Sequence, residues 1–286
     1  MTAAELLALS GEALGDLGGW WPARTPFEVS VGAVLVQAVA WRNAQLAIDA
    51  LARRDLLQAD ALSRATREEV AAAVRPALFH RQKAGYLQAL ARFVHEELQG
   101  DILSLKAQPP SEQRRRLLAL RGIGPETAAA IMVYALGEAV PVVDRYAIRL
   151  LTRIGAINPE DGAQAAQAAM SAAIAGDPAR ARLLHATIVE IARGPCRPEP
   201  RCASCPIAAS CPKVLGHPAQ GRGDRPGRNA GRAAAPSEAG DSGGGRAAPP
   251  QGGGRAGARI VGQGAGEGLG QSQRPRQRQG RRHRGA

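Results

Sequence analysis

The stretch LRGIGPETAAAIMVYALGEAVPVVD, residues 120–144, contains the features that decide the fold. It opens on a glycine-flanked turn, Gly122-Ile123-Gly124, and runs into a helical pattern that begins at Pro125. Glycine accepts the backbone dihedrals of a tight turn. Proline suits the first position of a helix, because the N–H that it lacks has no partner there. We therefore predict a hairpin followed directly by a helix, with uncovered backbone amides at the turn.

A carboxylate follows this hairpin. Asp144 comes 20 residues after Gly124, behind the apolar run 140–143 and before a helical pattern at 145–154. On the residues alone it is most simply a helix N-cap. Amides at a helix N-terminus bind phosphate, however, so a hairpin with an acid behind it also indicates chemistry on a nucleic acid.

The composition divides the chain near residue 213. Residues 1–213 are rich in Ala, Leu, Ile and Val, enough to bury a core, and carry only +3 of the net charge of +12. The remainder holds 20 of the 34 glycines and a net charge of +9. We expect residues 214–286 to form a disordered, basic tail rich in Gly, Pro and Arg. This tail either adds non-specific attraction to a polyanion or is incidental.

Nothing in the sequence indicates a membrane or secreted protein. No apolar run reaches the ~18 residues that a membrane span needs. Glu5 and Glu12 stand where a signal peptide is basic. We therefore expect a cytoplasmic protein, in a reducing compartment that keeps its four cysteines out of disulfides.

Helical patterns account for the body of the chain. Residues 27–40, FEVSVGAVLVQAVA, predict a buried helix to about residue 39, and a second helix begins at Arg42. Residues 83–98 are amphipathic, and Thr66 with Glu69 forms a capping box. Other helices are predicted at 3–9 with 12–17, at 59–65, from 111, at 160–175 and at 179–193. The fold class is therefore all-α.

The aromatic residues allow two interpretations. Trp20, Trp21 and Trp41 are all the tryptophans of the chain and lie within 22 residues. The residues alone favour core packing over a stacking surface for an extruded base. Gln37 is either a satisfied core amide or a polar finger that enters the gap left by a flipped base.

The loop at residues 77–82 also carries candidates for contact with DNA. Phe79 is either a local core contact or a wedge for DNA. Arg81, two residues further on, is a candidate for DNA binding.

Four cysteines near residue 200 predict a metal centre. Cys196, Cys202, Cys205 and Cys211 lie within 16 residues, with prolines between them. Zinc sites with four cysteines usually come as two Cys-x2-Cys pairs, and only one such pair is present. A compact loop of this kind suits a [4Fe–4S] cluster, with zinc as the alternative.

These motifs together resemble the endonuclease III branch of the helix-hairpin-helix DNA glycosylases. LRGIGPETA, VVDRYAIRL and the four-cysteine loop occur in the family's order, and the likeness covers residues 20–212. It implies a two-domain all-α fold with double-stranded DNA across the cleft. A six-helix barrel, 28–135, would carry the hairpin. A second domain, 1–27 with 136–213, would hold the iron–sulfur cluster.

The resemblance also implies roles for particular residues. Asp144 matches the catalytic aspartate, and the four cysteines match the cluster ligands. Gly122, Ile123, Gly124 and Thr127 would contact the DNA backbone, with a monovalent cation at the hairpin. The protein would act as a monomer, associated with the nucleoid.

The tryptophans resemble those of the 3-methyladenine glycosylase sub-branch. There, aromatic side chains at these places line the base pocket. With this likeness, a pocket is favoured for Trp21 and Trp41, with Trp20 and Gln37 beside them. Stacking of a methylated base on indole has a cation–π component worth ~1–2 kcal/mol.

One departure from the family bears on the mechanism. Members that cleave the strand have a lysine after Gly-x-Gly-x, and this chain has Glu126 there. A carboxylate cannot form an imine, and none of the three lysines, Lys83, Lys106 and Lys213, lies in the hairpin. We therefore predict a monofunctional glycosylase for a damaged base, with an alkylated purine as the expected base. The alternatives are a glycosylase for oxidised pyrimidines or mismatches with weak strand cleavage, and a non-catalytic DNA-binding protein.

Overall fold

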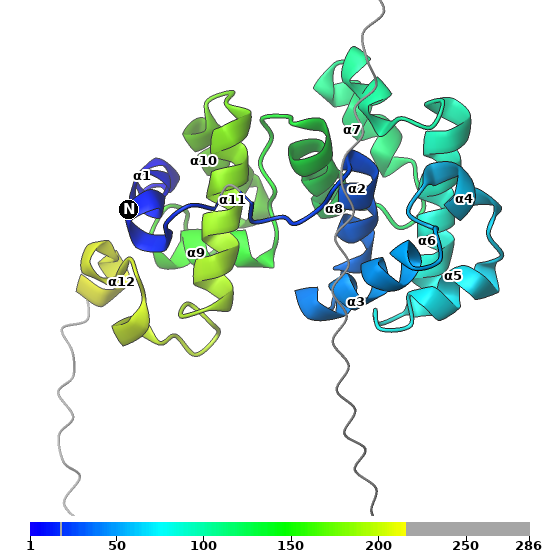
Figure 1. Cartoon of the computed structure of the whole chain (residues 1–286). Helices are drawn as coiled ribbons and strands as arrows, with labels where there is room; N and C mark the ends of the chain where they lie inside the picture. The colour runs from blue at the N-terminus through cyan, green and yellow to red at the C-terminus, as the bar shows by residue number, and fades with distance from the viewer. Residues whose placement is uncertain (18, 216–286) are drawn as a thin grey trace, which may run out of the picture. The chain divides into compact units, whose positions relative to one another are not determined.

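The computed structural model describes residues 1–17 and 19–215 (Figure 1). Over these residues the secondary structure is helical, which confirms the all-α prediction. The predicted tail lies outside the described residues from position 216 onward. The elements are α1 Ala3–Leu14, α2 Pro26–Leu35, α3 Trp41–Ala52, α4 Ala59–Arg64, α5 Arg67–Ala73, α6 His80–Arg92, the π-helix η1 Phe93–Glu97, the 3-10 helix η2 Ile102–Ala107, α7 Pro110–Leu118, α8 Pro125–Ile131, the π-helix η3 Met132–Leu136, α9 Arg145–Arg153, α10 Gly162–Ile174, α11 Pro178–Arg193, the 3-10 turns η4 Cys202–Ser204 and η5 Ala208–Ser210, and α12 Pro212–Leu215.

The helices pack in two groups. Helices α2 to α8 pack on one another, with α6 against α4 and α5, and α2 against α3, α6 and α8. Helices α9, α10 and α11 form the second group, and α1 packs on α10 and α11 although it comes first in the sequence (Figure 1). The π-helix η3 contacts both α2 and α11 and so links the groups. The predicted division into two domains stays a prediction.

The predicted cap at Thr66 is confirmed. The Thr66 side chain accepts a hydrogen bond from the Glu69 N–H at 3.2 Å, and the Glu69 carboxylate accepts one from the Thr66 N–H at 2.8 Å. This is the predicted capping box. The amphipathic pattern at 83–98 is confirmed as well, although its helix begins at His80 and ends in a π-helix.

The buried helix at 27–40 is shorter than predicted. Helix α2 ends at Leu35, and residues 36–39 form a turn in which Ala38 has a left-handed φ of 58°. The apolar pattern runs on, but the carbonyls of Leu35 and Gln37 accept hydrogen bonds from the Lys83 ammonium and not from the next helical turn. A contact from another helix therefore ends α2.

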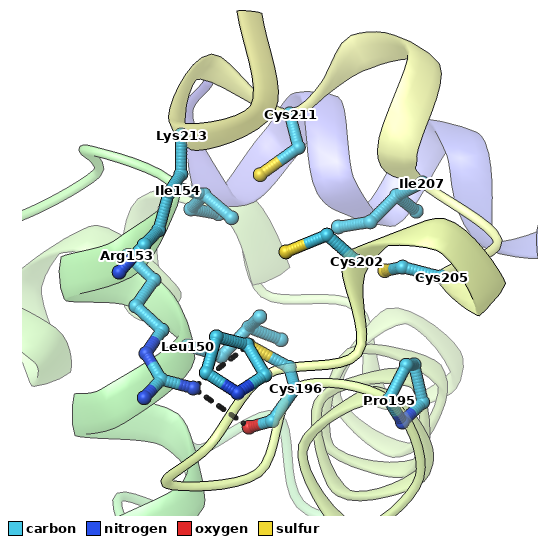
Figure 2. A pocket seen from close by; sticks show the side chains of 11 residues that line it. Leu150, Arg153, Ile154, Pro195, Cys196, Cys202, Cys205, Ile207, Cys211 and Lys213 are labelled. Carbon is cyan, nitrogen blue, oxygen red and sulfur yellow. Dashed lines mark hydrogen bonds between the residues drawn. The ribbon is translucent and has the colours of Figure 1, made fainter. Parts of the chain in front are cut away.

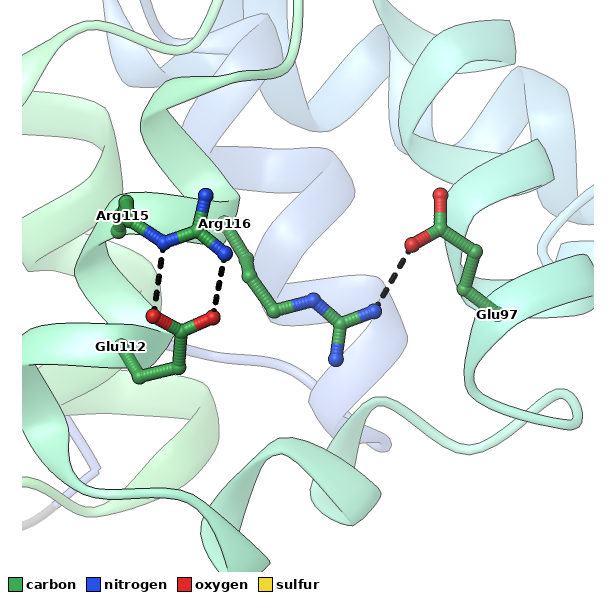
Figure 3. Close-up of polar contacts among 4 residues, drawn as sticks. All are labelled: Glu97, Glu112, Arg115 and Arg116. Carbon is green, nitrogen blue, oxygen red and sulfur yellow. Dashed lines mark hydrogen bonds and ion pairs between the residues drawn. The ribbon is translucent and has the colours of Figure 1, made fainter.

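Helix α7, which leads into the hairpin, is fixed by ion pairs (Figure 3). Arg115 binds Glu112 within the helix at 2.5 Å, and Arg116 binds Glu97 of η1 at 2.8 Å. The Arg116 guanidinium also lies 4.9 Å from the centre of the Phe93 ring. These arginines are therefore engaged with carboxylates of their own chain. Of the described residues, no helix is long and apolar enough to cross a membrane.

The hairpin between α7 and α8 has the predicted geometry. Gly122 has a φ of 86°, and Pro125 occupies the first position of α8. A Cβ on Gly122 would lie 2.1 Å from the Tyr86 ring, because this ring packs directly on the turn. Gly124, in contrast, has a φ of −87° and no neighbour within 4 Å of an added Cβ. Glycine is therefore required at the first position of the turn and not at the second.

This difference predicts unequal effects of two alanine substitutions. Gly122→Ala would have to adopt a left-handed conformation and displace Tyr86, so we expect it to lower the free energy of unfolding by about 2 kcal/mol. Gly124→Ala is the matched control, and its effect should stay below about 0.5 kcal/mol. Urea denaturation measures both. Equal stability of the two variants would show that Tyr86 does not support the turn.

Candidate active site and nucleic-acid interface

The hairpin exposes part of its backbone to solvent, and neighbouring side chains support it from the inside of the protein. Ile123 is buried, whereas Gly124 and the first residues of α8 are exposed. The Gln37 side-chain amide donates hydrogen bonds to the Gly122 carbonyl and to the Thr127 Oγ1, both at 2.9 Å. The Gln37 side chain therefore supports the hairpin. Thr127 is buried and supports the turn from within α8.

Asp144 caps α9, as the sequence predicts. Its Oδ1 accepts a hydrogen bond from the Ala147 N–H at 2.7 Å, and only 6% of the residue is exposed. Burial raises the pKa of Asp144 above its ordinary value, whereas the N–H groups of Ala147 and Tyr146 and the charge of Arg145 oppose this rise. The cap fixes one carboxylate oxygen, and the carboxylate is poorly hydrated.

A second carboxylate stands near Asp144. Glu126, in the first turn of α8, is exposed. Its pKa is raised by desolvation and by the negative charge of Asp144, and lowered by Arg145. Helices α8 and α9 thus bring their N-terminal acids into electrostatic reach of each other. Arg145 is the cation that faces both acids.

The three tryptophans form one cluster with a tyrosine and a histidine. The Trp21 ring lies 4.8 Å from the Tyr134 ring and 5.4 Å from the Trp41 ring, centre to centre. The Trp20 ring lies 5.6 Å from the His185 ring. This cluster gathers side chains of the 15–25 segment, α3, η3 and α11. Burial is the main cause of the raised pKa of Tyr134, and the negative charge of Asp144 raises this pKa further. The charge of Asp144 therefore acts electrostatically on Tyr134 of this cluster.

Polar contacts inside the cluster fix its orientation. The Tyr134 hydroxyl and His185 Nδ1 are 2.8 Å apart, and the Trp20 Nε1–H donates to Glu190 at 2.8 Å. His185 is buried, and burial lowers its pKa to about 4. The imidazole is therefore neutral at pH 7. Within residues 1–17 and 19–215, the buried indole N–H of Trp21 has no acceptor.

The Phe79 loop is exposed. Leu78 and Phe79 are 54% and 58% exposed, and Phe79 adopts a left-handed φ of 60°. They line an open cavity together with the turn at 38–40 and the side chains of Asn43 and Arg75. The structure thus places Phe79 at the surface and not in a local core. Arg81 is exposed in the first turn of α6.

The four cysteines line a single small cavity together with residues of α9 such as Leu150 and Arg153 (Figure 2). Burial raises the pKa of the Cys205 thiol, and the other three thiols raise it further. Across the described ranges, no three His, Cys, Asp or Glu side chains converge closely enough to hold one metal ion. The cysteines therefore surround a space and do not meet at a point.

Two arginines of α9 hold the first cysteine in place. Arg149 donates to the carbonyls of Cys196 at 3.1 Å and Ala192 at 2.7 Å. Arg153 donates to the Cys196 carbonyl at 3.1 Å and to its sulfur at 3.4 Å (Figure 2). It also donates to the Pro198 carbonyl at 2.7 Å. Helix α9 therefore carries Asp144 at one end and the cysteine loop at the other.

Sequence reasoning missed several of these residues. Tyr134 and His185 are 51 positions apart, and neither is unusual in its own helix. His185 could have been noticed as a lone imidazole in the apolar stretch LLHATIVEIA. Lys83 was seen only as a lysine outside the hairpin, and the sequence holds no signal for its contact with α2.

His185 predicts a loss of stability in acid. Its folded pKa of about 4 lies below its ordinary value of 6.5. As the pH falls from 6.5 towards 4, His185 is therefore protonated in the unfolded chain before it is protonated in the folded protein. The free energy of unfolding falls by about 3 kcal/mol over this range. We expect His185→Gln to reduce this pH dependence in urea denaturation between pH 7.5 and 4.5. His95→Gln, at an exposed position, is the control. An unchanged pH dependence in His185→Gln would contradict the assignment.

Comparison with known proteins agrees with this arrangement. The model for HhH-GPD superfamily base excision DNA repair proteins matches residues 31–175. A protein of Methanocaldococcus jannaschii whose name describes it as a DNA repair glycosylase is 33% identical over 193 residues, which are 67% of this chain and 88% of that protein.

Solved structures show the same fold. An H. pylori 3-methyladenine DNA glycosylase bound to 1,N6-ethenoadenine matches with a TM-score of 0.59 and 25% identity over 68% of this chain and 98% of its own. A trapped covalent endonuclease III–DNA intermediate matches with a TM-score of 0.63 and 20% identity, over 76% and 98% of the two chains. The predicted helix-hairpin-helix glycosylase fold is thereby confirmed. The chain belongs to the HhH-GPD superfamily of base excision DNA repair proteins, a family of DNA N-glycosylases.

Proposed function

We propose that this glycosylase is monofunctional and hydrolyses the N-glycosidic bond of an alkylated purine in double-stranded DNA, with Asp144 as the catalytic carboxylate. The observation that carries the proposal is the buried carboxylate of Asp144, held at the start of α9 beside a hairpin that has no lysine. The protein acts as a monomer on a base that it has extruded from the duplex.

Asp144 has the properties that hydrolysis requires. The Ala147 N–H holds one carboxylate oxygen, so the orientation of the group at the start of α9 is fixed. The ionised carboxylate stabilises the positive charge that develops on the sugar as the bond to the base breaks, and orients the water that adds its hydroxyl to C1′. Because burial raises the pKa of Asp144, activity should fall in acid sooner than with an ordinary aspartate.

The lysines support hydrolysis without strand cleavage. Lys83 is buried and bonded to two carbonyls, and Lys213 lines the cysteine cavity. Lys106 is in η2, outside the hairpin. At the position of the family's lysine stands Glu126, whose carboxylate adds negative charge beside Asp144. No amine is therefore at hand to form a Schiff base with the sugar.

The aromatic cluster is the proposed base pocket, with Trp21 and Trp41 as its stacking faces and Trp20 beside them. Support comes from the electrostatic influence of Asp144 on Tyr134 of the cluster, and from the indole N–H of Trp21, since a buried donor without an acceptor is rare. A hydrogen-bond acceptor on the bound base would satisfy this donor. An electron-poor, alkylated purine also stacks well on indole. The structural likeness to a glycosylase bound to ethenoadenine favours the same class of base.

The hairpin and the Phe79 loop are the proposed contacts with DNA. The backbone of the hairpin at Gly122, Ile123 and Gly124 would contact a phosphate, with a monovalent cation at the carbonyls and Thr127 as internal support. The Ile123 N–H donates to the Leu120 carbonyl at 3.1 Å and so stabilises the turn itself. Phe79 would enter the base stack as a wedge, and Arg81 would bind the backbone. DNA would then lie between the barrel at 28–135 and the domain formed by 1–27 with 136–213. Gln37 would support the hairpin through its hydrogen bonds to Gly122 and Thr127.

The four cysteines fit a [4Fe–4S] cluster better than a zinc ion. Their side chains line one cavity, and the sequence has only one Cys-x2-Cys pair where zinc sites with four cysteines usually have two. Cys196, Cys202, Cys205 and Cys211 would be its ligands, and the cluster would cross-link the loop that Arg149 and Arg153 hold. Its role here would be structural, since no step of the hydrolysis uses it.

An assay with defined lesions tests the reaction. Duplexes that carry an alkylated purine, an oxidised pyrimidine or a mismatch are incubated with the protein, and products are resolved before and after alkali. We expect base release from the alkylated purine, and strand breaks only after alkali. Breaks without alkali would refute the monofunctional assignment. Release from another duplex would refute the base class.

The Asp144→Asn variant tests the catalytic residue. Asparagine keeps the helix cap but cannot carry the negative charge, so base release should fall by about 100-fold or more. Binding to a duplex with an abasic-site analogue should persist. Full activity of Asp144→Asn would rule out Asp144 as the catalytic carboxylate, and unchanged function in every assay would favour a non-catalytic DNA-binding protein.

Metal analysis of the purified protein tests the cluster. We expect about four iron atoms per chain, visible absorption, and loss of both in Cys205→Ser. Ser204→Ala changes a neighbouring residue that is not a ligand and should retain the iron. One zinc per chain without iron would establish the alternative.

A further inference from the structure

Lys83 is a buried cation that binds the end of another helix. Only 2% of the residue is exposed, and its Nζ donates to the carbonyls of Leu35 at 2.9 Å and Gln37 at 2.7 Å. The last carbonyls of a helix have no partner within it, and a cation at this end is favourable. Burial lowers the pKa of Lys83 to about 8, so that at pH 7 the ammonium is still the main form. The charge therefore holds the end of α2.

The turn that Lys83 holds is the one that holds the hairpin. The Gln37 carbonyl accepts from Lys83, while the Gln37 side chain donates to Gly122 and Thr127 at 2.9 Å each. The next residue, Ala38, has a φ of 58°, which is unfavourable for a residue with a Cβ. The surrounding contacts must maintain this conformation, and the Lys83 bond is among them.

The same face of α6 reaches two further loops. Phe79 precedes α6 as its N-cap, and Tyr86 packs on Gly122 of the hairpin. Residues 79, 83 and 86 are spaced by four and three positions and so share one side of the helix. One helix therefore sets the Phe79 loop, the turn at 36–39 and the hairpin relative to one another.

We propose that Lys83 is a positioning residue for DNA binding, which keeps the hairpin, the 36–39 turn and the Phe79 loop at one fixed spacing. This inference rests on the proposed function, because the contacts of these loops with DNA belong to it. Phosphates on a duplex have a regular spacing, and contacts to them fix the register of a protein. Loops that shift independently would bind the duplex more weakly. Lys83 itself is buried and cannot reach a phosphate.

Removal of the ammonium tests this role. Lys83→Met keeps the length of the side chain, and Lys106→Met removes a cation at an exposed position as the control. Binding is measured to a duplex with a tetrahydrofuran abasic analogue at two salt concentrations. We expect Lys83→Met to bind about tenfold more weakly, with an unchanged salt dependence because no phosphate contact is lost. Base release at saturating enzyme should stay near the rate of the unmodified protein, since Asp144 lies on α9.

A second variant keeps the proposal testable if Lys83→Met does not fold. Gln37→Met leaves the ammonium in place and breaks the two bonds to the hairpin. It should weaken binding to the same extent, and the double variant should bind no more weakly than Gln37→Met. Binding of Gln37→Met, or of folded Lys83→Met, that equals binding of Lys106→Met would overturn the proposal. Failure of the unmodified protein to bind or to release any base would refute the proposed function instead.

Discussion

The hydrogen bond from the Ala147 N–H to the Asp144 carboxylate is the interaction on which the candidate site depends. A helix must satisfy its first N–H groups, and here the group that does so is also the acid at the centre of the site. The bond sets the rotamer of Asp144 without a dedicated neighbour. It also offsets part of the cost of burying a carboxylate. A single contact thus serves the start of α9 and the orientation of the acid.

Helix α9, which Asp144 caps, is also bonded to the cysteine loop. Arg149 and Arg153 lie one helical turn apart and donate to carbonyls of the loop, so the loop and the helix are held as one body. The opposite end of the helix carries Asp144. The loop follows the last long helix, and its Ile207 is buried in the hydrophobic core. Its attachment to α9 explains why a segment of short turns adopts a defined arrangement.

The sequence predicts the local features of the site well. The hairpin at Gly122, the cap at Asp144 and the cysteine loop are each set by neighbouring residues, and a turn or a cap can be recognised from its own chemistry. The end of α2 could not be predicted, because it depends on Lys83, 46 positions away from Gln37.

The pairing of Tyr134 with His185 is hidden for the same reason. Side chains that meet across helices leave no periodic signal in either helix. The tryptophan cluster could be predicted from the sequence only in part. Their proximity in sequence marks them as a group, but the direct packing of their rings and the involvement of Tyr134 are properties of the tertiary structure.

The aromatic cluster has a spectroscopic consequence. The chain contains three tryptophans, and all three belong to this cluster. The intrinsic ultraviolet emission of the protein therefore originates almost entirely from one place, beside Asp144, with no background from indoles elsewhere. Trp20 is hydrogen-bonded to a carboxylate, whereas the Trp21 N–H has no acceptor among the described residues, so their emission should differ in sensitivity to polarity. The molecule thus contains its own optical probe of any change in the packing of this cluster.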